Sequence, residues 1–223
     1  MRALILPFTA LALMAQPPMA SQNMVAQNTP AQQKKIAATL ARTAAPAKNF
    51  KLSGQPSAPL TIEIYADYQC PQCRNLYMQV IPELESQYVA KGKVQLLHRD
   101  FPLSMHQYSK LATRYANAAG QLGRYDVVVN QIFKTQPEWS QNGNIDAQVA
   151  KVLDAADLAK IREMVKSDAH LDDTVTADVA QGTRDNLNST PTMVFVSKGK
   201  RTKVDGFMPF PILKSYIDQL LSK

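Results

Sequence analysis

Cys70-Pro71-Gln72-Cys73 contains the only two cysteines of the chain. A disulfide between two residues so close in sequence would constrain the unfolded chain little. A zinc site normally needs four ligands and this pair supplies two, so we expect no metal, and we expect no other cofactor. A purely structural bridge and two unrelated buried thiols stay open as alternatives. The position of the pair, directly after an apolar run and before a helical pattern, favours redox chemistry.

The segments on either side of the cysteine pair predict a strand followed by a helix. Residues 59–66 are rich in β-branched and aromatic side chains, which predicts a strand. Apolar residues then recur at every fourth position from Leu76 to Tyr88, which predicts a helix to about Ala90. Pro82 lies within this helix and is expected to kink it.

The two cysteines are expected to differ in chemistry because they stand at different points of this helix. Cys70 falls near the N-cap, and Pro71 falls near the first helical position, which proline favours. Unpaired backbone N–H groups and the helix dipole stabilise negative charge there, so the pKa of Cys70 should be lowered. Cys73 lies one turn further and should be more buried and less ionised. We therefore expect Cys70 to exchange with the substrate and Cys73 to resolve the mixed disulfide.

A second conspicuous segment begins at Thr190-Pro191, far downstream. A proline at the entry of a strand is tolerated only in special positions, and a cis Thr190–Pro191 bond would explain it. An ordinary trans turn is the alternative, because most X–Pro bonds are trans. After a turn at Lys198-Gly199-Lys200, residues 201–206 predict the second strand of a hairpin, and residues 210–221 predict an amphipathic helix.

The order of these elements resembles the thioredoxin fold, and the motifs resemble those of the DsbA-like thiol:disulfide oxidoreductase family. The matching residues are Asp67-Tyr68-Gln69-Cys70-Pro71-Gln72-Cys73, Arg99-Asp100-Phe101-Pro102-Leu103 with His106, Thr190-Pro191-Thr192, and Gly206. The resemblance spans Leu60 to Leu221 and implies an α/β thioredoxin fold with an inserted all-helical subdomain. It also implies that Thr190 and Pro191 face the cysteine pair, bind the substrate backbone and keep metals away from the thiols.

The chain departs from the family pattern at two positions. Many relatives carry a buried acid six residues before the first cysteine, whereas this chain has Ile64 there and Glu63 one residue earlier. Because strand side chains alternate between faces, Glu63 should point away from the cysteines. The most oxidising relatives carry histidine at the position of Gln72. A neutral amide stabilises a thiolate less than a cation does, so we expect a weaker oxidant than those relatives.

The residues from about 105 to 188 separate the two halves of the expected site. Their apolar side chains recur at helical spacing, with glycines and prolines between the runs, which predicts the inserted helical subdomain. His106 falls at its start, where a capping or surface role is favoured over a role at the site. We expect His98 to be structural and His170 to be a solvated residue between helices.

The N-terminal part of the chain has a different composition from the rest. Residues 1–20 are expected to be a signal peptide, with cleavage after Ala15 or Ala20, and residues 21–49 a basic linker of low complexity before the domain at 50–223. Six basic residues precede the first acidic residue, Glu63, and the rest of the chain holds 19 basic and 18 acidic residues. The formal net charge of +7 therefore belongs to the N-terminal segment, which argues against a nucleic-acid-binding domain.

The sequence predicts an exported, periplasmic thiol:disulfide oxidoreductase that donates the Cys70–Cys73 disulfide to reduced secreted proteins. The resemblance implies a membrane redox partner that reoxidises it. A reductase or isomerase of the same fold, kept reduced by a membrane donor and acting on misoxidised proteins, is the alternative. Isomerases usually dimerise, and we expect a monomer because no separate dimerisation domain is evident. A non-catalytic chaperone module that binds peptides beside Thr190-Pro191 is a further alternative.

Overall fold

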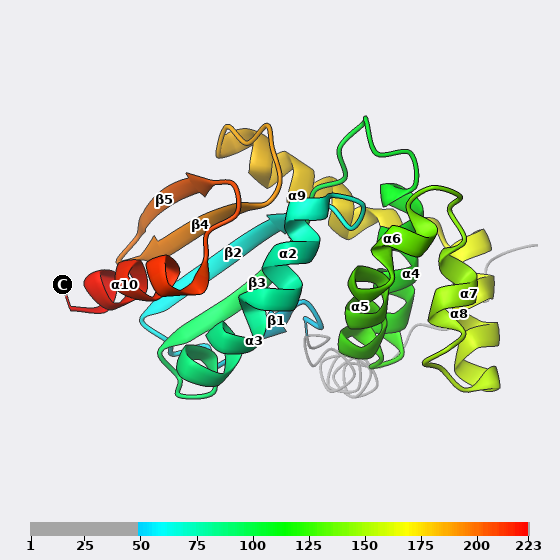
Figure 1. Ribbon diagram of the computed structural model, residues 1–223, viewed down its shortest axis with the longest axis horizontal. Helices are drawn as coiled ribbons and strands as arrows, with labels where there is room; N and C mark the ends of the chain where they lie inside the picture. Colours follow the sequence, from blue (N-terminus) through cyan, green and yellow to red (C-terminus); the bar gives the residue numbers. More distant parts are fainter. Residues whose placement is uncertain (1–48, 223) are drawn as a thin grey trace, which may run out of the picture. The chain divides into compact units, whose positions relative to one another are not determined.

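The structure is a computed structural model and describes residues 49–222 (Figure 1). Within these residues, five strands form one sheet in the order β1-β3-β2-β4-β5. The strands are β1 (Leu52–Ser53), β2 (Leu60–Ala66), β3 (Val94–Asp100), β4 (Thr192–Ser197) and β5 (Lys200–Asp205). Strands β2 and β3 run parallel, and the other neighbours pair antiparallel. The predicted signal peptide and nearly all of the predicted linker lie outside the described residues.

Strand β2 lies at the centre of the sheet because the side chains on both of its faces are either apolar or hydrogen-bonded within the protein. Ile62 and Ile64 belong to the larger apolar core, whereas Tyr65 belongs to a smaller cluster with Phe101 and Val194. This alternation is the expected two-residue period of a strand. In the parallel pairing of β2 with β3, Ile64 lies opposite His98. The C-terminal end of β2 leads directly to the cysteine pair.

The helical segment after Cys70 is broken, whereas the sequence predicted one kinked helix to about Ala90. Helix α2 (Pro71–Gln79) ends before Val80, α3 (Ile81–Leu84) follows, and the π-helical turn η1 (Glu85–Val89) completes the segment. Proline lacks a backbone N–H, and its ring clashes with the carbonyl four residues earlier. The break therefore falls two residues before Pro82 rather than at it.

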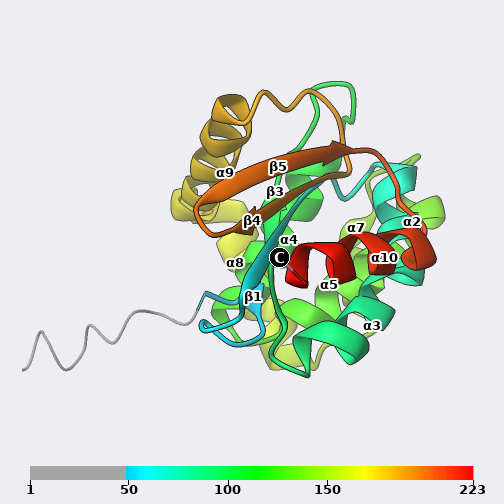
Figure 2. The ribbon, with the colours of Figure 1, turned by 90° about the vertical axis from the view of Figure 1, so that its left-hand side faces the viewer.

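Helices cover both faces of the sheet (Figure 2). Helices α2, α3 and α10 (Phe210–Leu221) lie on one side, and α9 (Asp173–Arg184) lies on the other. Helix α10 has the bounds that its amphipathic pattern predicts, and it buries Leu213 and Ile217. The predicted hairpin is present as β4 and β5.

An all-helical region is inserted between β3 and β4 and confirms the expected α/β fold with a helical insertion. Besides α9, its elements are α4 (Ser109–Gln121), α5 (Tyr125–Lys134), α6 (Gln136–Trp139), α7 (Ile145–Val149), α8 (Ala155–Ser167) and the 3-10 turn η2 (Ala169–Asp172). The indole of Trp139 is fully buried in this region and donates a hydrogen bond to the Ile132 carbonyl at 2.8 Å. Among residues 49–222, no helix has the length and apolar character needed to cross a membrane.

Candidate active site

Cys70 and Cys73 lie at the N-terminus of α2, at the end of the central strand. Cys70 is the N-cap residue, with extended backbone angles, and Pro71 begins the helix. Both cysteines are free thiols in the structure. Cys70 is 6% exposed and Cys73 is fully buried. The predicted difference in accessibility between the two sulfurs is therefore present.

The surroundings of the two sulfurs shift their pKa values in opposite directions. Hydrogen bonding from Cys73 contributes most to lowering the pKa of Cys70 to about 5, against the opposing effect of burial. The backbone N–H groups of Cys73 and Gln72 lower it further. Burial raises the pKa of Cys73 well above its ordinary value. At neutral pH the reduced pair therefore holds a thiolate at Cys70 and a thiol at Cys73.

The segment Thr190-Pro191 lies against Cys70, although 120 residues separate Thr190 from it in sequence. The Thr190–Pro191 peptide bond is cis, as expected from the proline at the strand entry. The Cys70 Sγ lies 3.3 Å from the Thr190 carbonyl oxygen, and the Pro191 carbonyl accepts from the Gly206 N–H at 2.8 Å. The hydroxyl of Thr190 is buried and makes no hydrogen bond to the described residues. The structure thus brings together both halves of the site that the sequence indicated.

Gln72 stands apart from this cluster. Its side chain is exposed, and its Oε1 accepts a hydrogen bond from Asn75 Nδ2 at 3.3 Å. The side chain of Gln72 therefore neither buries nor hydrogen-bonds the Cys70 sulfur, and its contribution to the pKa of Cys70 comes from its backbone N–H.

Gln136, at the start of α6, fixes the turn that carries Cys70, and the sequence analysis missed it. Its side chain is 4% exposed, and its Nε2 donates to the carbonyls of Tyr68 at 2.7 Å and of Cys70 at 3.0 Å. Gln69 makes a second link: its Nε2 donates to the Ser140 carbonyl at 2.9 Å, and its Oε1 accepts from the Tyr108 N–H at 2.7 Å. The side-chain amides of Gln136 and Gln69 therefore join the inserted helical region to the turn that carries Cys70.

His106 contacts the same turn, contrary to the capping or surface role that the sequence favoured. Its Nδ1 lies 2.8 Å from Oδ2 of Asp67, whose side chain is fully buried. The histidine precedes α4 in a loop, and the contact with Asp67 spans 39 residues. Position along the chain could not reveal it, because it depends on how the loop after β3 folds back over the end of β2.

Glu63 points to the opposite face of the sheet, as the alternation of strand side chains predicted. Its carboxylate accepts from Arg99 Nε at 2.7 Å and from Arg201 Nη1 and Nη2 at 3.0 Å each. Burial would raise the pKa of Glu63, but the hydrogen bonds from Arg201 and Arg99 outweigh this and hold it below its ordinary value. Glu63 is therefore part of an ion-pair cluster, away from Cys73.

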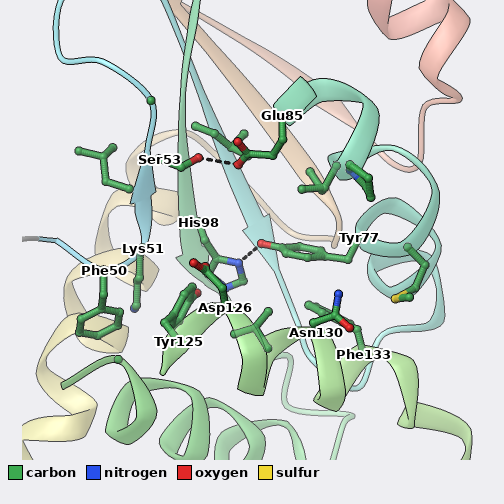
Figure 3. A pocket seen from close by; sticks show the side chains of 18 of the residues that line it. Phe50, Lys51, Ser53, Tyr77, Glu85, His98, Tyr125, Asp126, Asn130 and Phe133 are labelled. Carbon is green, nitrogen blue, oxygen red and sulfur yellow. Dashed lines mark hydrogen bonds between the residues drawn. The ribbon is translucent and has the colours of Figure 1, made fainter. Parts of the chain in front are cut away.

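His98 lines a cavity of about 750 Å³ on the α2 side of the sheet (Figure 3). Its Nδ1 hydrogen-bonds the Tyr77 hydroxyl, and its Nε2 lies 3.0 Å from Oδ1 of Asp100. Asp100 also pairs with the ammonium group of Lys51, which lies 3.2 Å from Oδ2 of Asp178. These are the contacts of a buried structural residue, as the sequence indicated for His98.

The remaining histidine, His170, lies on the surface. His170 lies in η2 with its side chain 85% exposed and 3.0 Å from Asp173, which agrees with a solvated residue between helices. Among residues 49–222, no group of three or more histidines, cysteines or acidic residues is arranged to hold a metal ion.

Comparison with known proteins places this geometry in a family. A family model described as Thioredoxin matches residues 46–218. The crystal structure of Wolbachia pipientis alpha-DsbA1 aligns with a TM-score of 0.66 at 19% identity, covering 81% of this chain and 95% of that chain. The structure of Pseudomonas aeruginosa DsbA2 aligns with a TM-score of 0.61 at 25% identity, covering 77% of this chain and 93% of that chain.

A curated relative supports the same assignment. Over 126 residues the chain is 29% identical to a Bacillus cereus protein named "Probable disulfide bond formation protein D". The match covers 54% of this chain and 56% of that protein, so it spans little more than half of the relative's length.

Proposed function

Because the chain belongs to the thioredoxin family, as a DsbA-like thiol:disulfide oxidoreductase, we propose that it oxidises reduced exported proteins with its Cys70–Cys73 disulfide. The observation that carries this proposal is the position of Cys70 at the N-cap of α2, beside the fully buried Cys73, a position that lowers the pKa of Cys70 to about 5. A thiolate stabilised at neutral pH favours the reduced form of the pair. A disulfide whose reduced form is stabilised is a strong oxidant.

The proposed reaction consists of two thiol–disulfide exchanges. A substrate thiolate attacks Cys70 Sγ, the Cys70–Cys73 bond breaks, and its electron pair leaves on Cys73 Sγ, which then takes up a proton. The product is a mixed disulfide between the substrate and Cys70. A second substrate thiolate attacks the substrate sulfur of this bond, and Cys70 leaves as a thiolate. The substrate has then gained a disulfide, and the enzyme holds two reduced cysteines.

Substrate binding in this proposal uses the backbone beside the cysteines. The Thr190 carbonyl lies 3.3 Å from Cys70 Sγ, and Thr190 with Pro191 would bind the substrate main chain next to the sulfur under attack. The buried hydroxyl of Thr190, which makes no hydrogen bond within residues 49–222, offers a polar group at this point. Recognition of backbone rather than side chains would suit a range of unfolded substrates.

The proposal includes export, a membrane partner and a monomeric enzyme. Residues 1–20 have the composition of a signal peptide, and the compartment beyond the membrane permits disulfides to persist. Each turnover leaves the pair reduced, so a membrane redox partner has to remove two electrons. The name of the Bacillus cereus relative, a disulfide bond formation protein, is consistent with the oxidising direction.

Trapping of the mixed disulfide tests this function. In Cys73→Ser the Cys70 thiolate can attack a disulfide of an exported protein, one substrate sulfur leaves as a thiolate, and no Cys73 thiol is present to cleave the mixed disulfide that forms. The variant should therefore accumulate covalent complexes with exported proteins that reductant releases. Cys70→Ser should form none and should lose peptide-oxidation activity. Equal turnover by wild type and Cys70→Ser would overturn the proposal. Full complementation of a deletion strain by Cys70→Ser/Cys73→Ser would instead favour the chaperone alternative.

A further inference from the structure

Asp67 lies between the end of β2 and the start of α2, and its carboxylate is held by three donors. Oδ1 accepts from the Gln69 N–H at 2.7 Å, and Oδ2 accepts from the Leu103 N–H at 2.7 Å. The third donor is Nδ1 of His106, at 2.8 Å from Oδ2. The side chain of Asp67 is fully buried, whereas that of His106 is 19% exposed. Among residues 49–222, no lysine or arginine pairs with Asp67, so this buried carboxylate depends on such donors for stabilisation.

The backbone of Asp67 touches both cysteines. Its N–H donates to the Sγ of Cys73 at 3.4 Å, and its carbonyl accepts from the Cys70 N–H at 3.1 Å. In the proposed first exchange, the electron pair of the broken disulfide leaves on Cys73 Sγ. An N–H already directed at that sulfur stabilises the departing thiolate in the way that a backbone donor stabilises an oxyanion.

We propose that His106 is a positioning residue that acts through the carboxylate of Asp67 to stabilise the reduced cysteine pair and the departing Cys73 thiolate. This inference rests on the proposed redox function. The Nδ1–H of His106 disperses part of the negative charge of Asp67, and it ties the loop after β3 to the turn before Cys70. The first effect lowers the repulsion between Asp67 and a cysteine thiolate. The second keeps the Asp67 N–H directed at Cys73.

Loss of the His106 donor should act on the reduced form more than on the oxidised form. The reduced pair carries a negative charge on a residue whose backbone N–H bonds to the Asp67 carbonyl, whereas the disulfide is neutral. A carboxylate with less dispersed charge repels the thiolate and so favours the disulfide. His106→Ala should therefore shift the equilibrium with glutathione about tenfold toward the disulfide, which corresponds to a potential lower by about 30 mV.

Two companion variants separate charge from shape. In His106→Asn the side-chain amide can place a donor where Nδ1 stands, so its equilibrium constant should return to within about threefold of wild type. In Asp67→Asn/His106→Ala the repelling charge is absent, so the double variant should be a stronger oxidant than His106→Ala alone. His170→Ala is the matched control, because His170 pairs with Asp173 at 3.0 Å on an exposed surface. It should leave the equilibrium constant unchanged.

The test equilibrates full-length mature protein and each variant with glutathione buffers and measures the reduced fraction. The Cys70 pKa, from thiolate absorbance, is measured in parallel and should rise in His106→Ala. A wild-type equilibrium constant in His106→Ala, with only its unfolding midpoint lowered, would overturn the inference. If the double variant does not fold, the difference between His106→Ala and His106→Asn decides. A wild type that does not oxidise peptide thiols would instead contradict the proposed function.

Discussion

Glu63 and Asp67 are buried carboxylates four residues apart in the chain, and their surroundings differ in kind. Glu63 is paired with two guanidinium groups, those of Arg99 and Arg201. Asp67 is held by two backbone N–H groups and one imidazole, with its own N–H on the sulfur of Cys73. The ion pairs of Glu63 lie on one face of the sheet, with Tyr65, whereas the turn at Asp67 leads to the active site.

The difference indicates which electrostatic interactions serve stability and which serve chemistry. The positive charges of Arg99 and Arg201 stabilise the Glu63 carboxylate. A substitution at Glu63 should therefore alter the free energy of unfolding. The Asp67 carboxylate is held by hydrogen-bond donors rather than by an arginine or lysine in the described residues. Its interaction energy should therefore depend on the charge of the cysteine sulfurs nearby. The following experiments test this division, from the largest expected effect to the smallest.

Glu63→Gln should destabilise the protein without altering its redox chemistry. The substitution leaves Arg99 and Arg201 around a neutral amide, and breaking a buried pair costs about 3 kcal/mol. Urea unfolding should show this loss, and the glutathione equilibrium should match that of wild type. Glu138→Gln is the control, because the Glu138–Lys151 pair is more than half exposed on both sides and should contribute little. A changed redox equilibrium in Glu63→Gln would break the division.

The reduced form should be more stable than the oxidised form at neutral pH, and this advantage should disappear in acid. The pKa of Cys70 is lowered from 9.0 to about 5, so its contribution to stability is fully present above the higher value and is lost as pH falls through the lower one. At pH 7 the two-unit interval above the lowered pKa is worth about 3 kcal/mol.

Urea unfolding of both redox forms across the acid range measures this difference. Cys70→Ala should lack the part of the pH dependence that distinguishes the reduced form, because the titrating sulfur is gone. An advantage of the reduced form that stays constant from neutral pH to below the lowered pKa would show that the thiolate is not its source.

Gln136→Leu should loosen the turn at Cys70 from the side of the helical insertion. The carbonyl of Tyr68 would lose its donor in a buried place, at a cost of about 1–2 kcal/mol. The Cys70 carbonyl keeps the Arg74 N–H at 3.1 Å, so the helix should still form. Gln141→Leu, at an exposed glutamine five positions later, is the matched control. Equal unfolding midpoints for the two variants would show that Gln136 does not hold the turn.

Gln72→His should have the smallest effect. The side chain of Gln72 is exposed, so an imidazole there interacts with the Cys70 thiolate through solvent. We expect about a twofold shift toward the reduced form, or roughly 10 mV, in the oxidising direction. The glutathione equilibrium measures it. A shift in the reducing direction would contradict the view that a cation at this position stabilises the thiolate.

Much of the fold and the residues that meet at the candidate site could be predicted from the sequence, because local patterns encode them. Strand β2, the hairpin and α10 follow from two-residue and helical periodicity, and the face of Glu63 follows from alternation along β2. Cys70 and Cys73 stood out by their spacing, and Thr190-Pro191 by its place at a strand entry. The helix breaks at Val80 rather than at Pro82, because a proline disrupts the helical turn that precedes it.

The groups that hold the cysteine turn could not be predicted in the same way. Gln136 reaches the Cys70 carbonyl across 66 residues, and His106 reaches Asp67 across 39. Neither contact has a periodic signal, because each depends on how a loop or helix packs against the turn. A local signal existed only for Asp67, an acid directly after a strand, where aspartate commonly accepts hydrogen bonds from nearby backbone. Strand β1 has two residues, too few for any pattern.

The reduction potential of the mature wild-type protein tests the central claim most directly. Equilibration with glutathione buffers gives the ratio of reduced to oxidised Cys70–Cys73 pair. Known oxidoreductases span about −120 mV for strong oxidants to about −270 mV for thioredoxin. Stabilisation of the Cys70 thiolate predicts a value nearer the −120 mV end. A value near −270 mV would contradict the oxidase function and favour a reductase or isomerase of the same fold.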